Sequence, residues 1–362
     1  MMLMKDGSNN SSDMCLLEYM KIKKCLSLIC FLEGQLPTTL KQLHISDCEN
    51  LKSLTEGMMH RNSIGINNLE YLSIRICPSL IGFPEGELPT TLKELKIWRC
   101  EKLESLPGGM MHHDSNTTTA TSGDVHVLNI WECPSLIFFP ISKFPSTLKK
   151  LEIRDCARLE SISEKMFHFN NSSLECLVIS RYPYLKIIPD CLHKLRELDI
   201  YNCENVELLP HQLQNLTALT SLTISHCENI KTSLFQWGLA TLTSLKHLTI
   251  ARIFPQVASF SEGQRLPLLP TNLIYISIKD FQNLKSLSSL ALQILTSLEK
   301  LWIQCCPKLQ SFCPREGLPD NLSQLYIKDC PLLKQRCSKR RGQDWPNIAH
   351  IPYVKIDNES HL

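Results

Sequence analysis

One short phrase recurs along this chain of 362 residues and constrains its fold more than any other feature. The phrase reads L-x-x-L-x-I-x-x-C-x-x-L, and two clear copies are LPTTLKQLHISDC at 36–48 and LPTTLKELKIWRC at 88–100. Successive isoleucine anchors lie 21–33 residues apart. The anchors are Ile22, Ile45, Ile74, Ile97, Ile130, Ile153, Ile179, Ile200, Ile224, Ile250, Ile278, Ile303 and Ile327. Repetition of this kind predicts a stack of similar coils.

The aliphatic residues of the phrase predict one short strand in every repeat. Leu and Ile two positions apart point to one side of a strand, and the variable residues point to the other. Parallel strands of successive repeats would stack about 4.8 Å apart and share one aliphatic core. The repeat length is typical of leucine-rich repeats. We therefore predict an α/β leucine-rich-repeat solenoid: a curved horseshoe with a parallel β-sheet on the concave face and an irregular or short helical convex side.

Three parts of the chain are distinguished by composition and repeat content. Residues 1–14 are polar and are predicted to be disordered, and residues 15–334 hold about 13 repeats. The basic tail at 335–362 is predicted to cap the last coil. A polar insertion at 112–124 is predicted to be a long surface loop. No convincing polar cap precedes the first coil, so we expect the chain to be a truncated form or a fragment of a larger protein.

Ten of the seventeen cysteines occupy the Cys position of the phrase, where the chain leaves its strand. A thiol is small and apolar and can donate weakly to a turn carbonyl while it packs as core. No C-x-x-C pair or histidine cluster recurs, so zinc is not expected. We predict a column of buried, reduced thiols. The column comprises Cys25, Cys48, Cys77, Cys100, Cys133, Cys156, Cys203, Cys227, Cys306 and Cys330, with Tyr182, Ile253 and Phe281 as substitutes.

Charge and hydropathy limit the cellular compartment and the classes of binding partner that we expect for this chain. The net charge of +2 gives no reason to expect nucleic acid or a membrane as partner. The apolar run at 25–32 is too short to span a bilayer, and the polar start lacks a signal-peptide core. With seventeen cysteines and no secretion signal, we expect a reducing intracellular setting, either cytoplasmic or nucleo-cytoplasmic.

Enzyme chemistry is not expected from the residue pattern. Histidines and acids are scattered over outward positions, with no Ser/His/Asp or Cys/His arrangement that stacked coils would bring together. No Gly-Lys pair occurs, so there is no phosphate-binding loop and no cofactor is predicted. His112 and His113 are interpreted as solvated loop residues, and Cys305 as an ordinary outward substitution. The basic run at 334–342 is interpreted as solvating the end of the chain.

The outward strand positions hold the candidate binding residues. Directly after the anchor, four consecutive repeats place an arginine, two tryptophans and a second arginine. Exposed strands favour aromatics in any case, but Trp and Arg also dominate binding hot spots. Two charged residues of the next column are expected to orient a partner. The candidates are Arg75, Trp98, Trp131 and Arg154, with Lys96 and Glu152 beside them, and further along Tyr201, Tyr275, Trp302 and Tyr326.

The chain resembles the leucine-rich-repeat region of plant nucleotide-binding, leucine-rich-repeat disease-resistance proteins, especially the coiled-coil class. The LPTTLKxLxI pieces, ECPSLIFFP and the end KDCPLLKQRCSKRRGQDWPNIAHIPYVKID at 328–357 carry the resemblance, which covers residues 15–357. It implies non-catalytic recognition of protein partners in plant immunity. Those partners would be a pathogen effector, a guarded host protein or the receptor's own nucleotide-binding domain. The absence of a phosphate-binding loop means that ATP or ADP binding does not carry over.

Two other classes of function were weighed against this one. A leucine-rich-repeat substrate adaptor of a ubiquitin ligase also uses repeats with this cysteine. Such an adaptor would need an N-terminal helical motif that residues 1–14 cannot supply. An enzyme is disfavoured because the repeat pattern does not bring catalytic residue types together at one site.

Overall fold

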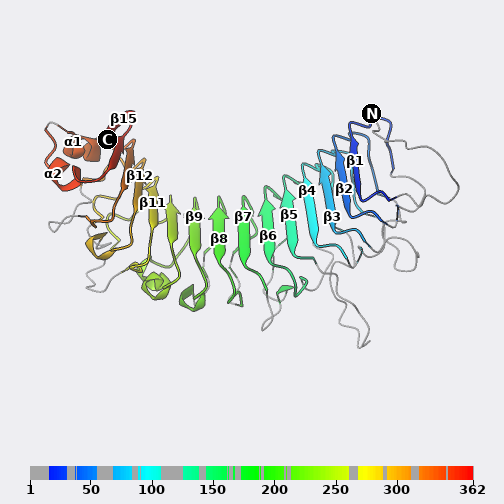
Figure 1. Ribbon diagram of the computed structural model, residues 1–362, viewed down its shortest axis with the longest axis horizontal. Coiled ribbons are helices and arrows are strands. Elements are labelled where there is room, and N and C mark those ends of the chain that lie inside the picture. The colour runs from blue at the N-terminus through cyan, green and yellow to red at the C-terminus, as the bar shows by residue number, and fades with distance from the viewer. Residues whose placement is uncertain are drawn as a thin grey trace. The chain divides into compact units, whose positions relative to one another are not determined.

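The structure is a computed structural model, drawn in Figure 1 with its strands labelled. The chain divides into two compact units, Met1–Tyr184 and Leu185–Leu362. The described residues are 16–30, 37, 39–54, 68–83, 89, 91–106, 125–137, 144–160, 162, 166–167, 173–186, 188, 191–207, 209, 213–260, 268–287, 292–310, 318–339 and 341–361. The predicted disordered segment 1–14 and the predicted loop 112–124 lie outside them.

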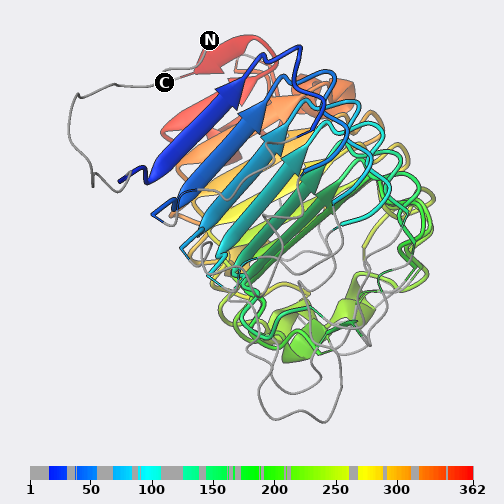
Figure 2. The same ribbon diagram turned by 90° about the vertical axis from the view of Figure 1, so that its right-hand side faces the viewer.

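The first unit contains seven strands, one at each predicted anchor. Each strand pairs in parallel with the next (Figure 2). Leu pairs with Leu and Ile with Ile wherever the phrase has both. The register is uniform because a shift of one residue would turn the aliphatic side chains out of the core. The strands are β1 (Tyr19–Lys23), β2 (Gln42–Ser46), β3 (Tyr71–Arg75), β4 (Glu94–Trp98), β5 (Val127–Trp131), β6 (Lys150–Arg154) and β7 (Cys176–Ser180).

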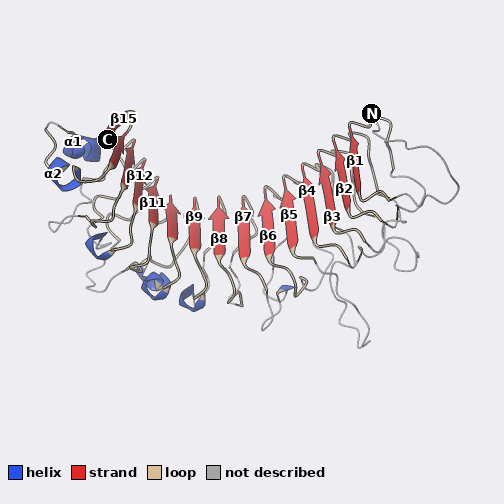
Figure 3. Ribbon diagram, viewed as in Figure 1, coloured by secondary structure: helices blue, strands red, loops and turns tan. Residues whose placement is uncertain are grey.

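The second unit continues the same pattern with six further anchored strands. They are β8 (Glu197–Tyr201), β9 (Ser221–Ser225), β10 (His247–Ala251), β11 (Tyr275–Lys279), β12 (Lys300–Gln304) and β13 (Gln324–Lys328). These strands also pair in parallel and in register. Between them run short 3₁₀ turns, so the connecting side is irregular, as predicted (Figure 3). The turns are η3 (Leu213–Asn215), η4 (Phe235–Trp237), η5 (Leu239–Thr241) and η7 (Leu292–Ile294).

The C-terminal tail has more regular structure than the sequence interpretation gave it. Helix α1 (Pro331–Cys337) begins before residue 335 because Pro331 directly follows the last cysteine of the column and suits a first helical turn. Helix α2 (Trp345–Ile348) follows. Strand β14 (Tyr353–Ile356) then pairs in parallel with β13, and β15 (Glu359–His361) pairs antiparallel with β14.

The inward Leu and Ile residues of the strands form the core. Leu95 and Ile97 of β4, for example, are 0% and 1% exposed. The first coil is the exception, since Met20 and Ile22 are only half-buried and Leu16 is 79% exposed. The core is therefore continuous from β2 onward within the first unit and looser at β1.

Each strand from β1 to β14 is followed by one residue in the left-handed region, with φ between 44° and 59°. None of these residues is glycine, and Ile76 is β-branched, for which this conformation is unfavourable. The turn allows one more bond in the ladder. The amide of Ile76 donates to the Trp98 carbonyl at 2.8 Å, and that of Arg99 donates to the Trp131 carbonyl at 3.0 Å. Local strain is thus offset by a continued hydrogen-bond ladder.

The cysteine column is buried and reduced from the second coil onward. The described cysteines are free, and every column member except the half-buried Cys25 is buried. The thiols donate to the carbonyl two residues earlier, as from Cys133 to Trp131 at 3.4 Å and from Cys306 to Gln304 at 3.3 Å. This confirms the prediction that each thiol bonds a turn carbonyl while packing as core. The substitute Tyr182 is also fully buried.

Alkaline pH should destabilise the protein through two of these thiols, those of Cys156 and Cys227. Burial raises the pKa of Cys227 to about 11 and also raises the pKa of Cys156, whereas thiols of the unfolded chain ionise near 8.5. The stabilisation of the folded state by the protonated Cys227 thiol is therefore fully present below about pH 8.5 and is lost as the pH rises toward 11. We expect a loss of about 2–3 kcal/mol for Cys227 alone. Urea unfolding at pH 7, 9 and 10.5 measures this loss, which should be smaller for Cys227→Ala. An equal pH slope for both proteins would contradict it.

Candidate functional site

The outward residues of the first unit form three rows across the strands, because residues one, three and five of each strand share a face. The fifth-position residues of β3 to β6 are defined here as the tryptophan row. The register pairs Arg75 with Trp98, Trp98 with Trp131, and Trp131 with Arg154. The row is Arg75, Trp98, Trp131 and Arg154, so the structure brings together the four residues that the repeat spacing aligned.

Each tryptophan of the row carries one arginine against its ring. The guanidinium carbon of Arg75 lies 5.9 Å from the Trp98 ring centroid, and that of Arg154 lies 5.8 Å from the Trp131 centroid. The described residues include no ring contact between the two indoles. Trp98 Nε1 instead donates to Glu132 Oε1 at 3.0 Å. This bond and the flanking arginine hold the Trp98 indole while leaving it half-buried.

The middle row differs from the sequence interpretation. Lys96 lies there as predicted, half-buried, with Nζ 2.7 Å from Glu94 Oε1. Glu152 lies there too, but it is only 5% exposed because Lys150 and Arg154 of the same strand pair with it at 2.8 and 3.9 Å. The expectation that Glu152 is presented to a partner is therefore wrong. Its carboxylate is instead paired within its own strand, more closely with Lys150 than with Arg154.

Unpaired polar atoms gather beneath the second half of the row. Within the described part of the chain, buried Asn129 Oδ1, Trp131 Nε1 and Arg154 Nε have no hydrogen-bond partner, although Arg154 keeps its ion pair with Glu152. Buried polar atoms are nearly always paired, and an unpaired one costs about 1–3 kcal/mol. One donor and one acceptor on strand β5, and a second donor on β6, are therefore buried without a hydrogen bond, which makes this part of the outward face costly to fold.

Asn129→Leu should raise the free energy of unfolding by about 1 kcal/mol, because it removes an unsatisfied acceptor from a site that is 5% exposed. Urea unfolding of the variant and of the parent chain measures the difference. Asn229→Leu is the matched control, since the Asn229 amide donates to the Glu204 carbonyl at 2.7 Å and its loss should not stabilise. A destabilised Asn129→Leu protein would show that Asn129 is satisfied in the folded chain.

A second aromatic group lies in the second unit. Tyr275 and Trp302 meet edge to face with centroids 5.7 Å apart, and Trp302 and Tyr326 lie 5.1 Å apart. They come from the neighbouring strands β11, β12 and β13. Tyr201 is not part of this group, because β9 and β10 separate its strand β8 from β11. Its hydroxyl lies 3.5 Å from Asp199 Oδ2.

The Leucine Rich Repeat family model matches residues 194–216, which include β8 and the turn η3. The in-register parallel strands, the inward Leu and Ile residues and the irregular connecting side agree with this match. The fold is a leucine-rich-repeat solenoid.

Plant disease-resistance proteins are similar to this solenoid in sequence. A disease resistance protein of Arabidopsis thaliana is 32% identical over 95% of this chain and 24% of its own length. The TMV resistance protein N of Nicotiana glutinosa is 25% identical over 56% of this chain and 19% of its own length. Among solved structures, the leucine-rich effector YopM of Yersinia pestis has 19% identity and a TM-score of 0.49, covering 94% of this chain and 89% of its own. The chain spans about a quarter or less of the length of these disease-resistance relatives.

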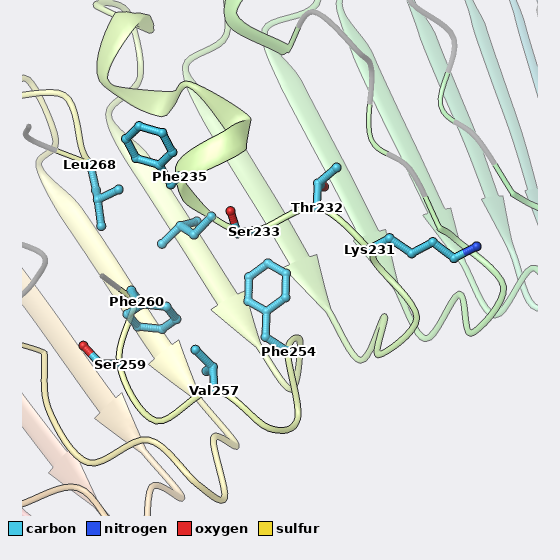
Figure 4. A pocket seen from close by; sticks show the side chains of 10 residues that line it. Lys231, Thr232, Ser233, Phe235, Phe254, Val257, Ser259, Phe260 and Leu268 are labelled. Carbon is cyan, nitrogen blue, oxygen red and sulfur yellow. The ribbon is translucent and has the colours of Figure 1, made fainter. Parts of the chain in front are cut away.

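The connecting side of the second unit of the solenoid holds one cavity that sequence reasoning missed. It has a volume of about 220 Å³ and is lined mainly by Phe235, Phe254, Phe260 and Leu268 (Figure 4). Phe254 has φ 52° and contacts Trp237 with centroids 5.6 Å apart. The aromatic residues between the phrases at 224 and 278 were the only sequence signal of this cavity.

Metal binding, membrane spanning and a reactive Cys305 gain no support from the described residues. Across the described residues no group of three or more His, Cys, Asp or Glu could hold a metal ion, and no helix is long and apolar enough to cross a membrane. Cys305 is half-buried with Sγ 3.8 Å from Asp329 Oδ2, and burial and nearby Asp280 raise its pKa, which disfavours the thiolate. His112 and His113 lie outside the described residues.

Proposed function

We propose that this chain is the protein-recognition region of a plant intracellular immune receptor and that the tryptophan row is its partner-binding surface. Recognition would be of a pathogen effector, a guarded host protein or the receptor's own nucleotide-binding domain, and the receptor would be of the coiled-coil class. Similarity to disease-resistance proteins over 95% of this chain supports the setting. The free cysteines of the described residues support a reducing compartment.

The observation that carries the binding proposal is the alignment of two half-buried indoles with a flanking arginine on each in one row. A partner that covers Trp98 and Trp131 would remove water from two large apolar rings and from the cation–π contacts of Arg75 and Arg154, which strengthens both. Both effects favour the bound state, and neither contributes to folding of the free chain.

Trp98→Ala and Trp131→Ala should each weaken partner binding by about thirtyfold or more, equivalent to 2 kcal/mol, because central Trp residues dominate interfaces. A displayed peptide library is panned on the immobilised chain, and the affinities of enriched peptides are measured by calorimetry for each variant. Tyr184→Ala, which alters a 51% exposed tyrosine of the same unit outside the row, is the control. Peptides that bind both Trp variants normally would place recognition elsewhere.

The immune role is tested in the source plant. Disruption of the gene should reduce resistance to at least one pathogen isolate, and the wild-type sequence should restore it. The Trp98→Ala, Trp131→Ala double variant should accumulate to the same level and fail to restore resistance. Full restoration by the double variant would contradict the assignment of the row.

A further inference from the structure

Four lysines and four aromatic residues share the outward face of β11 to β14 in the second unit. The parallel register places Tyr275 beside Lys300, Trp302 beside Tyr326, and Tyr326 beside Lys355. This set is defined here as the lysine–aromatic patch. It comprises Lys279, Lys300, Lys328, Lys355, Tyr275, Trp302, Tyr326 and Tyr353, all of them half-buried.

The lysines of the patch have no acidic partner within the described part of the chain, since the ion pairs found there involve other residues. The outward positions of β11 to β14 contain no Asp or Glu at all. The nearest acids follow the strands, and Asp357 among them is already paired with Lys334 at 2.7 Å. In the first unit, by contrast, Lys96 and Lys150 each pair with a glutamate. The outward face of these strands therefore carries four lysines and no acid, although the charge of Lys328 also acts on Asp357 beyond the end of β14.

The aromatic rings hold two of these ammonium groups in place. Lys279 Nζ lies 5.9 Å from the Trp302 centroid, and Lys355 Nζ lies 5.5 Å from the Tyr326 centroid. A cation over a ring keeps its charge and gains when the contact is shielded from water. The rings and lysine stems also present apolar area between the charges. The surface thus offers charge and contact area together.

We propose that the lysine–aromatic patch binds an acidic segment of a partner protein. Four unpaired ammonium groups on one face complement carboxylates, and the rings would pack against the apolar parts of such a segment. Single-stranded nucleic acid is the competing class, but the rings already contact one another at 5.1 and 5.7 Å and leave no gap for a base to enter between them. This proposal uses residues of the second unit only and does not depend on the tryptophan row.

Titration of the full chain with poly-L-glutamate tests the patch. Binding is followed through the indole N–H signals of the chain's five tryptophans in ¹H–¹⁵N spectra. We expect the Trp302 signal, assigned from Trp302→Phe, to shift at about 50 mM salt, and the affinity to fall tenfold or more by about 300 mM. Lys300→Gln with Lys355→Gln should weaken binding at least tenfold. The control is Lys41→Gln with Lys93→Gln, which alters lysines already paired with Glu18 and Glu70.

Two outcomes would overturn the proposal. One is equal affinity of the patch variant and the control variant for poly-L-glutamate, which would make the binding a general charge effect. The other is tighter binding of an oligothymidylate with the same number of charges, which would assign the patch to nucleic acid. Unchanged circular dichroism of the Lys→Gln variants ensures that a lost affinity reflects the patch and not unfolding.

Discussion

Leu95→Ala should lower the free energy of unfolding by about 2–5 kcal/mol, whereas Trp98→Ala, three residues further along the same strand, should change it by about 1 kcal/mol or less. Leu95 is 0% exposed and packs in the shared core between β3 and β5. Its truncation leaves a cavity that stacked coils cannot close without shifting their register. Trp98 is half-buried on the outward face, where water can replace most of its contacts.

Thermal and urea unfolding of the two variants, with Trp131→Ala as a third, measures this contrast. The cation–π contact and the bond to Glu132 that Trp98 loses are both exposed, so each contributes little to folding. If the Trp variants unfold as readily as Leu95→Ala and still bind the enriched peptides, the row is structural and the proposed binding surface is wrong.

Gly342→Ala should destabilise the C-terminal tail by several kcal/mol. A Cβ at this position would lie 2.2 Å from the Arg336 carbonyl oxygen and 2.6 Å from the Ser338 amide nitrogen, both backbone atoms that cannot rotate away. The turn at Gly342 joins α1 to α2 and places Asp344, which is 5% exposed, against the Arg336 guanidinium at 2.7 and 2.8 Å. Displacing this turn would separate a mostly buried charge from its partner, which is costly.

Gly82→Ala is the matched control, since a Cβ there would meet only Ser105 Oγ at 3.6 Å, an ordinary contact. We expect faster hydrogen exchange at β13 and β14 in Gly342→Ala and normal exchange there in Gly82→Ala, because we propose that the tail caps the last coils. Equal exchange in the two variants would show that the turn moves without cost and that the tail is not a cap.

The strands were predictable because the Leu and Ile of the repeated phrase identify the residues on the inner face of each strand. Leu and Ile at fixed spacing allow one register, and β1 to β13 follow it. Strand β14 was missed because the phrase was required to contain Leu, although Ile351, Val354 and Ile356 keep its spacing. Any aliphatic residue can fill these inward positions, so a pattern that accepted all of them would have found a fourteenth coil.

The candidate site was predictable in position but not in exposure. Register alone aligns Arg75 with Trp98, because it depends only on the backbone. The burial of Glu152 and Asn129 depends on how side chains of the outer rows pack over the middle row, as Lys150 and Arg154 do at Glu152. The unpaired atoms beneath the row follow from that packing and have no signature in a single repeat.

Pairing of each coil only with its immediate neighbours has a consequence for heritable variation. Recombination between similar stretches such as 36–48 and 88–100 could remove or add whole coils in frame. Loss of the single coil that contains β5 would leave Leu95 and Ile97 facing Leu151 and Ile153, so the interior would remain matched. On the surface, however, Trp98 would then lie directly beside Arg154. A lineage carrying this solenoid could therefore change the order of residues that it presents to a partner in one genetic step, without passing through an unstable intermediate.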